Sequence, residues 1–200
     1  MAYDNPQMAQ TAAALAAGKP AVYPTETVYG IGVAVGRAEA PDVLFDIKRR
    51  PHGKPVAWLV GSVDELERYG SGVPDFARAI ARTFWPGPLT LIVNASEKVP
   101  PAFRSQEGTI GLRMPDNRTV LELIERVGAP LATTSANFSG CTPPQSFDEV
   151  DPELLDQVAA FLDDDEEKSG VSSTVLDCTK DHPTVVREGA ITIKDIAALC

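Results

Sequence analysis

Residues 21–36 read AVYPTETVYGIGVAVG, an apolar run followed by a polar loop and a second, glycine-containing apolar run. Residues 21–23 are apolar and Pro24 follows at once, which predicts a short buried strand that leads into a loop. Gly30, Gly32 and Gly36 do not match G-x-G-x-x-G, because the third glycine falls one position late, and they stand inside a strand-like run. The stretch therefore predicts strands of a buried sheet and argues against a dinucleotide-binding fingerprint.

Apolar runs of strand length alternate with helical patterns along the rest of the chain. Strands are predicted over residues 55–60, 89–93, 109–112, 131–133, 173–176 and 184–186, and helices over residues 7–17, 40–50, 63–69, 74–84, 118–127, 152–162 and 192–199. Such alternation is typical of an α/β fold with a largely buried sheet. The sequence contains no internal repeat and no obvious linker, so we expect a single domain over residues 1–200.

The composition limits the class of function. The formal net charge is −10, whereas proteins that grip a nucleic-acid backbone usually have a basic surface, so an anionic ligand must meet a local basic cluster. Cys141, Cys178 and Cys200 show no zinc or C-x-x-C spacing, which indicates reduced thiols. The sequence has no basic leader and no apolar run of membrane-span length, so we expect a soluble, cytoplasmic protein with no membrane partner.

Polar loops stand at the ends of the apolar runs. They are residues 24–27, 48–54, 113, 133–137, 172–174 and 187–189. In open α/β sheets, ligands bind in the crevice beyond the carboxyl ends of strands, where hydroxyls donate to anionic oxygens and Lys or Arg neutralises their charge. These loops therefore predict a pocket for a polyanion and a small polar molecule.

Each of these loops also has a simpler interpretation. The basic cluster fits a solvated helix end, the threonine-rich loops fit turn chemistry, and Arg113 fits a surface ion pair. The acidic run at residues 163–167 is expected to be a solvated loop. The chain has two histidines and no phosphate-binding P-loop motif, which makes histidine-dependent hydrolysis and a P-loop fold poor interpretations.

Seven segments of the sequence resemble the YrdC-like family. They are PTETVYGIG (24–32), KRRPHGKP (48–55), FWPGPLTLIV (84–93), GLRMPDN (111–117), APLATTSANFSG (129–140), SSTVLD (172–177) and VREGAI (186–191). The resemblance implies a twisted mixed sheet with flanking helices around a deep basic cavity. The segment DDDEEKSG before SSTVLD departs from the family pattern, in which this stretch is usually glycine-rich and neutral.

The resemblance also implies the synthesis of threonylcarbamoyl-AMP and pyrophosphate from L-threonine, bicarbonate or CO2, and ATP, with Mg²⁺. Partner proteins would then transfer the threonylcarbamoyl group to the tRNA adenosine beside the anticodon. Direct contact with tRNA is not expected of so acidic a chain. Two alternatives remain at this point: a carbamoyl-transfer maturation enzyme, and a non-enzymatic RNA-binding module, against which the net charge argues.

Site residues follow from the resemblance, motif by motif. It implies threonine contacts for Thr25, Arg113, Thr133 and Ser173, and nucleotide contacts for Lys48, Arg50, Lys54, Thr109, Ser135, Asn137, Pro143 and Arg187. Lys48, Arg50 and Arg113 are the expected catalytic residues: Lys48 and Arg50 hold phosphates, and Arg113 pairs with the threonine carboxylate. No covalent nucleophile is implied, so catalysis would consist of positioning and charge stabilisation. The sequence identifies no metal ligand.

Overall fold

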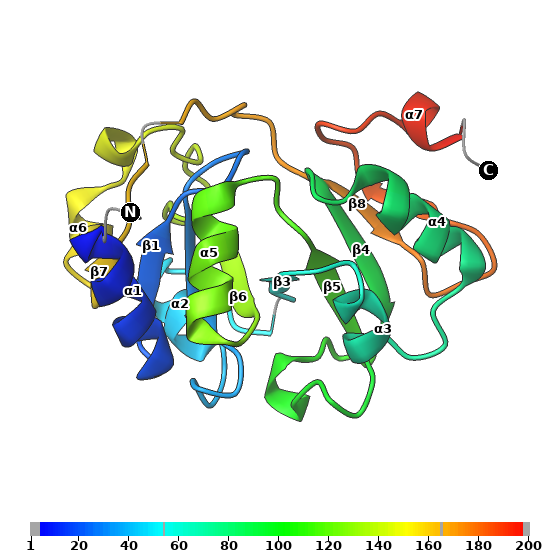
Figure 1. Ribbon diagram of the computed structural model, residues 1–200, viewed down its shortest axis with the longest axis horizontal. Helices are drawn as coiled ribbons and strands as arrows, with labels where there is room; N and C mark the ends of the chain where they lie inside the picture. Colours follow the sequence, from blue (N-terminus) through cyan, green and yellow to red (C-terminus); the bar gives the residue numbers. More distant parts are fainter. Residues whose placement is uncertain (1–4, 54, 165, 198–200) are drawn as a thin grey trace.

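A single mixed sheet organises the molecule (Figure 1). The computed structural model describes residues 5–53, 55–164 and 166–197. Within them, the strand order is β7-β1-β2-β6-β3-β5-β4-β8-β9, and the pairs β1/β7, β3/β5 and β4/β8 are parallel while the others are antiparallel. The strands are β1 (Ala21–Tyr23), β2 (Gly30–Ala34), β3 (Ala57–Leu59), β4 (Leu89–Asn94), β5 (Thr109–Arg113), β6 (Leu131–Ser135), β7 (Ala160–Phe161), β8 (Thr174–Asp177) and β9 (Thr184–Arg187). The expected α/β fold with a mixed sheet is confirmed.

Helices cover both faces of the sheet. They are α1 (Pro6–Ala16), α2 (Asp42–Ile47), α3 (Glu65–Tyr69), α4 (Asp75–Phe84), α5 (Arg118–Val127), α6 (Pro152–Leu155) and α7 (Ile193–Ala197). Two short 3₁₀ turns, Pro101–Phe103 and Phe147–Glu149, lie in the connections. No helix among the described residues is both long and apolar enough to cross a membrane.

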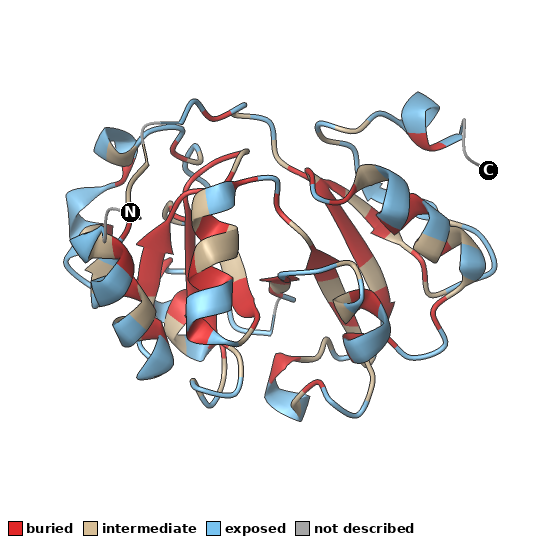
Figure 2. Ribbon diagram, in the orientation of Figure 1, coloured by how far each residue is buried: buried red, intermediate tan, exposed pale blue. Residues whose placement is uncertain are grey.

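The two faces of the sheet have separate apolar clusters. Helices α1 and α5 pack together over Tyr23 and Leu131. The neighbouring residues Val22 and Ala132 belong to a second cluster, with buried residues of α2, α3 and α4. Because successive strand residues point to opposite faces, the clusters lie on opposite sides of the sheet. Figure 2 shows the buried strands between helices whose outer surfaces are exposed.

Helix α5 shows how strongly local signals act. It spans the predicted residues, because the Asn117 side chain accepts a hydrogen bond from the Val120 N–H at its start and Gly128 adopts a φ of 68° at its end. An N-cap side chain and a left-handed glycine are the usual boundaries of a helix. The position of this helix could therefore be predicted from the sequence.

Two predicted helices are wrong in extent. The helix expected over residues 40–50 covers only Asp42–Ile47, so Lys48 and Arg50 lie in the turn that follows it. The helix expected over residues 152–162 ends at Leu155, and Ala160–Phe161 instead pairs with β1 as strand β7. Pairing with an existing strand edge is a tertiary interaction that outweighs the local pattern of a short apolar run.

Candidate active site

A cavity of about 720 Å³ lies on one face of the sheet. Its floor consists of residues from seven strands: Gly30, Ala57, Leu59, Thr90, Ile92, Thr109, Gly111, Arg113, Thr133, Ser135, Val175, Asp177 and Arg187. Thr133 and Ser135 follow Leu131 at alternate positions of β6, so they share its face. The cavity is therefore on the same face as α1 and α5, over the part of the sheet beyond them.

This position corrects the expectation of a crevice beyond the carboxyl ends of the strands. The strands contribute their middle residues as well as their ends, because they pair in a mixed rather than a uniformly parallel order. The floor has no room for a larger residue at Gly30, because a Cβ atom there would lie 2.9 Å from Cγ2 of Thr133. The lining carries four basic side chains and two acidic ones, so the expectation of a basic cavity holds.

Most of the predicted site residues meet in this cavity. Those that line it are Thr25, Arg50, Thr109, Arg113, Thr133, Ser135, Ser173 and Arg187. Lys48, Asn137 and Pro143 are not among the lining residues, and Lys54 lies outside the described residues. Segments that are far apart in the sequence thus converge on one site.

The loop after β1 is closed by its own threonines. The Thr25 hydroxyl donates to the Val28 carbonyl at 2.7 Å and accepts from the Thr27 N–H at 3.2 Å. Its oxygen also lies 2.9 Å from the Thr27 hydroxyl oxygen. The Thr25 hydroxyl is therefore satisfied within the loop, and it holds the loop in one conformation.

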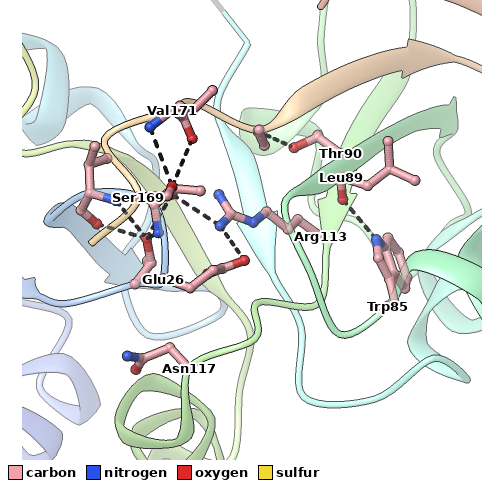
Figure 3. A network of polar contacts seen from close by, with 12 residues as sticks. Glu26, Trp85, Leu89, Thr90, Arg113, Asn117, Ser169 and Val171 are labelled. Carbon is pink, nitrogen blue, oxygen red and sulfur yellow. Dashed lines mark hydrogen bonds and ion pairs between the residues drawn. The ribbon is translucent and has the colours of Figure 1, made fainter. Parts of the chain in front are cut away.

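Two arginines stand at one end of the cavity. The buried Arg113 places Nη2 at 2.7 Å from Oε1 of Glu26 and at 3.1 Å from Oγ1 of Thr27, and its head points to Glu26 in Figure 3. Arg187 donates from Nη2 to the Ser173 carbonyl at 2.8 Å. Burial, together with the charge of Arg113, lowers the pKa of Arg187. A buried Arg113 is not the surface ion-pair residue of the alternative interpretation.

Lys48 lies behind the cavity wall. Its Nζ donates to the backbone carbonyls of Ser135 and Asn137 and lies 3.5 Å from Oδ1 of Asn137. These contacts occupy the three donors of an ammonium group. Burial first, and then the charge of Arg50, lowers the pKa of Lys48 to about 8. Lys48 therefore supports the turn at residues 135–137, while Arg50 lines the cavity itself.

The acidic run at residues 163–167 is only partly the solvated loop that was expected: Glu166 and Glu167 are exposed, whereas Asp163 and Asp164 are partly buried. The side chain of Asp164 is only 8% exposed and forms an ion pair with the buried Lys168. Asn117 donates to Asp164 at 2.9 Å, and the Tyr29 hydroxyl donates to Asp163. Hydrogen bonds from two other segments thus satisfy Asp163 and Asp164, and Lys168 balances one charge, which pattern alone did not reveal.

Some residues of the site were not singled out in the sequence. Glu26 and Thr27 lie inside the PTETVYG motif. Thr90 is a polar residue within the apolar strand LTLIV, which was a signal of a site. Its hydroxyl oxygen lies 3.0 Å from that of Ser173, and both residues line the cavity. Asp177 and Lys180 also line the cavity. Asp177 ends the SSTVLD motif, which was a signal, whereas nothing in the local sequence of Lys180 indicated a site.

Sequence comparisons find known proteins that match most of this chain. The family Sua5_yciO_yrdC, described as telomere recombination, matches residues 13–189. Threonylcarbamoyl-AMP synthase of Bacillus subtilis is 35% identical over 98% of this chain and 57% of its own length. A Mycobacterium tuberculosis (strain H37Rv) relative is 38% identical over 92% of this chain and 84% of its own length.

A solved structure shares the fold. The structure of Pyrococcus abyssi Sua5 in complex with L-threonine has a TM-score of 0.90 and 34% sequence identity, and covers 96% of this chain and 56% of that chain. The chain spans 57% and 53% of the lengths of the curated Bacillus subtilis and Pyrococcus abyssi relatives, little more than half.

Proposed function

This chain belongs to the Sua5/YciO/YrdC family, and we propose that it is a threonylcarbamoyl-AMP synthase. The observation that carries the proposal is a single cavity with two arginines at one end and hydroxyls along its floor. Arg113 and Thr109 mark the two ends of β5, which are roughly 13 Å apart at the usual rise of a strand. This length accommodates an amino acid at one end and a nucleotide at the other.

Threonine occupies the Arg113 end in this proposal. A guanidinium offers two parallel donors to a carboxylate, which fixes the direction of the amino acid as well as its position. Thr133 and Ser173 line the same cavity as Arg113. The amine of threonine then faces the centre of the cavity, where it combines with bicarbonate to give the carbamate and water.

The nucleotide occupies the Arg50 end. The carbamate oxygen attacks the α-phosphorus of ATP, the bond to the pyrophosphate oxygen breaks, and threonylcarbamoyl-AMP forms. Arg50 compensates phosphate charge, and Thr109 and Ser135 supply hydroxyls. Lys48 acts indirectly, because it donates to the backbone carbonyls of Ser135 and Asn137 and so holds the turn that carries Ser135. No side chain needs to form a covalent intermediate.

Mg²⁺ accompanies ATP in this proposal. Residues 5–53, 55–164 and 166–197 contain no cluster of three His, Cys, Asp or Glu side chains that could hold a metal ion. Mg²⁺ usually keeps several waters and binds through substrate phosphates with one or two carboxylates, so the cavity's two carboxylates, Glu107 and Asp177, fit it. The ion supplies neutralisation of phosphate charge.

The product would pass to partner proteins that modify tRNA in the cytoplasm. The net charge of −10 supports a division of labour in which this chain makes the activated group and other proteins bind tRNA.

Release of pyrophosphate tests the proposed function. With ATP, Mg²⁺ and bicarbonate present, we expect release to require L-threonine. The variant Arg113→Met should lose threonine-dependent release, whereas the matched control Arg82→Met, at an exposed position of α4, should retain it. Equal release with threonine omitted would contradict the proposal.

A further inference from the structure

Glu26 carries an unusual buried charge. Its side chain is 18% exposed, and both carboxylate oxygens are shielded from solvent and accept no hydrogen bond from the described residues. Arg113 Nη2, at 2.7 Å, is its partner. A buried carboxylate with so little compensation is costly, which indicates that this arrangement has a role besides stability.

Arg113 stands between Glu26 and the cavity. Arg113 lines the cavity, as do Thr25 and Thr27, whereas Glu26 between these threonines does not. Glu26 and Thr27 engage only Nη2 of the guanidinium, which has five N–H donors in all. Nε is buried and has no partner among the described residues. The donors of Nη1 have no partner among the described residues, and Nη1, unlike Nε, is not shielded from solvent, so they remain for a ligand carboxylate while Glu26 holds Nη2.

The charges at this end of the cavity also need a counter-ion. Burial first, and then the charge of Arg113, lowers the pKa of Arg187, so two guanidinium groups share this end of the cavity. Without substrate, Glu26 supplies a negative charge beside this pair. Arg113, Arg187 and Glu26 together leave one positive charge, which a single substrate carboxylate balances.

The backbone of Glu26 is fixed from outside by the segment that precedes β8. The Ser169 N–H donates to the Glu26 carbonyl at 3.0 Å, and the Gly170 N–H donates to the Thr27 carbonyl at 2.9 Å. Gly170 has a φ of 69°, and a Cβ there would lie 2.5 Å from the Gln145 side chain. The carboxylate is thus placed by two segments held against each other (Figure 3).

We propose that Glu26 is a positioning residue that orients the Arg113 guanidinium for the carboxylate of the amino-acid substrate. This inference rests on the proposed function. Glu26 does not touch the substrate; it holds Nη2, prevents rotation of the guanidinium, and leaves the remaining donors for the carboxylate. Placing a charged group accurately can account for roughly 100-fold in rate.

Kinetics of Glu26→Gln test this role. The amide keeps the shape of the side chain and removes its charge. We expect kcat/KM for threonine to fall about 10- to 100-fold, mainly through KM, with ATP binding in the absence of threonine unchanged. Glu26→Asp, which keeps the charge on a shorter side chain, should lose less, and the exposed control Glu97→Gln should match wild type.

A double-mutant cycle separates positioning from a merely structural effect. In an Arg113→Lys background, Glu26→Gln should change kcat/KM less than about twofold, because its effect passes through the guanidinium. A residue that only stabilises the fold would give the same additional loss in both backgrounds. Additive losses would overturn the proposal. Thermal unfolding of each variant identifies any that fail to fold, and Glu26→Asp then replaces Glu26→Gln in the cycle.

Nuclear magnetic resonance of the arginine side chains gives a readout that does not depend on activity. In the wild type, Arg113 should show slow rotation of its guanidinium, and Glu26→Gln should speed this rotation. Unchanged rotation overturns the proposal, and so does faster rotation with unchanged threonine kinetics. Absence of threonine-dependent release in the wild type would instead refute the proposed function, and the rotation measurement would still decide whether Glu26 holds Arg113.

Discussion

Lys48 and Arg50 are separated by one residue and have different surroundings. Arg50 lines the cavity, whereas the Lys48 ammonium is directed at carbonyl oxygens of the turn behind it. The turn after α2 produces this divergence, since Arg49 between them adopts a φ of 51°. Of two basic residues in one motif, one thus lines the cavity and the other supports the turn behind it.

The pH dependence of ATP binding should report on Lys48. Its pKa is lowered to about 8 from 10.5, so the ammonium loses a proton, and with it a donor, as the pH rises through about 8. We expect ATP affinity to fall between about pH 7 and about pH 9 because the turn at residues 135–137 loosens. Calorimetry at both pH values measures this change.

The free energy of unfolding, in contrast, should rise with pH through the titration of Lys48. Between about pH 8 and about pH 10.5 the unfolded chain binds the Lys48 proton and the folded chain does not, so titration of this group raises the free energy of unfolding with pH. Lys48→Arg cannot deprotonate and should remove both trends. ATP affinity that falls equally in Lys48→Arg would show that another group titrates.

At the scale of elements, the segment between β7 and β8 connects distant parts of the molecule. It runs across the loop after β1 and the start of α5, and then leads into β8. Its buried ion pair, Lys168 with Asp164, balances the charge of one residue in an acidic run that the sequence presents as solvated. The segment holds the backbone of Glu26 and Thr27, so its stability and the cavity geometry are linked.

Removal of Lys168 should be strongly destabilising. Lys168→Met leaves the buried Asp164 without its cation, which typically costs about 3–5 kcal/mol. Urea unfolding measures the loss, and the threonine KM should also rise. The double variant Asp164→Asn with Lys168→Met should recover part of the stability, because no unpaired charge remains. A loss below about 0.5 kcal/mol in Lys168→Met would indicate that the pair is effectively solvated.

At the scale of the whole molecule, the cavity spans strands on both sides of β3. Thr133 on β6 and Arg113 on β5 lie on either side of β3, with which both strands pair. Helices α1 and α5 cover one part of this face, and the cavity occupies the other. A ligand that fills the cavity would therefore contact strands on both sides of β3 at once.

Substrate binding should stabilise the entire fold. A ligand at about 100 times its Kd adds about 2.7 kcal/mol to the free energy of unfolding, and each kcal/mol raises Tm by about 2–4 °C in a protein of this size. We expect ATP with L-threonine to raise Tm by about 5 °C or more, and more than ATP alone. A thermal shift assay measures this, with Arg113→Met as the control. No increase at saturating ligand would contradict binding in this cavity.

The sequence by itself determined the elements that have strong local signals. Helix α5 has its cap residue and terminal glycine in the chain, and β1 ends at Tyr23, directly before Pro24. The seven motifs indicated the family, and they contain most of the residues that line the cavity. Capping, proline geometry and apolar periodicity act between neighbours in the sequence, so they can be recognised from the chain alone.

Only the tertiary structure decided how these elements combine. It placed Ala160–Phe161 beside β1, put the cavity on the face of the sheet, paired Glu26 with Arg113, and turned Lys48 away from the cavity. Each of these depends on partners far away in the sequence, whose strand pairing, burial and charge compensation outweigh local preference. Sequence pattern carries no record of such partners, because their energies arise only when the sheet assembles.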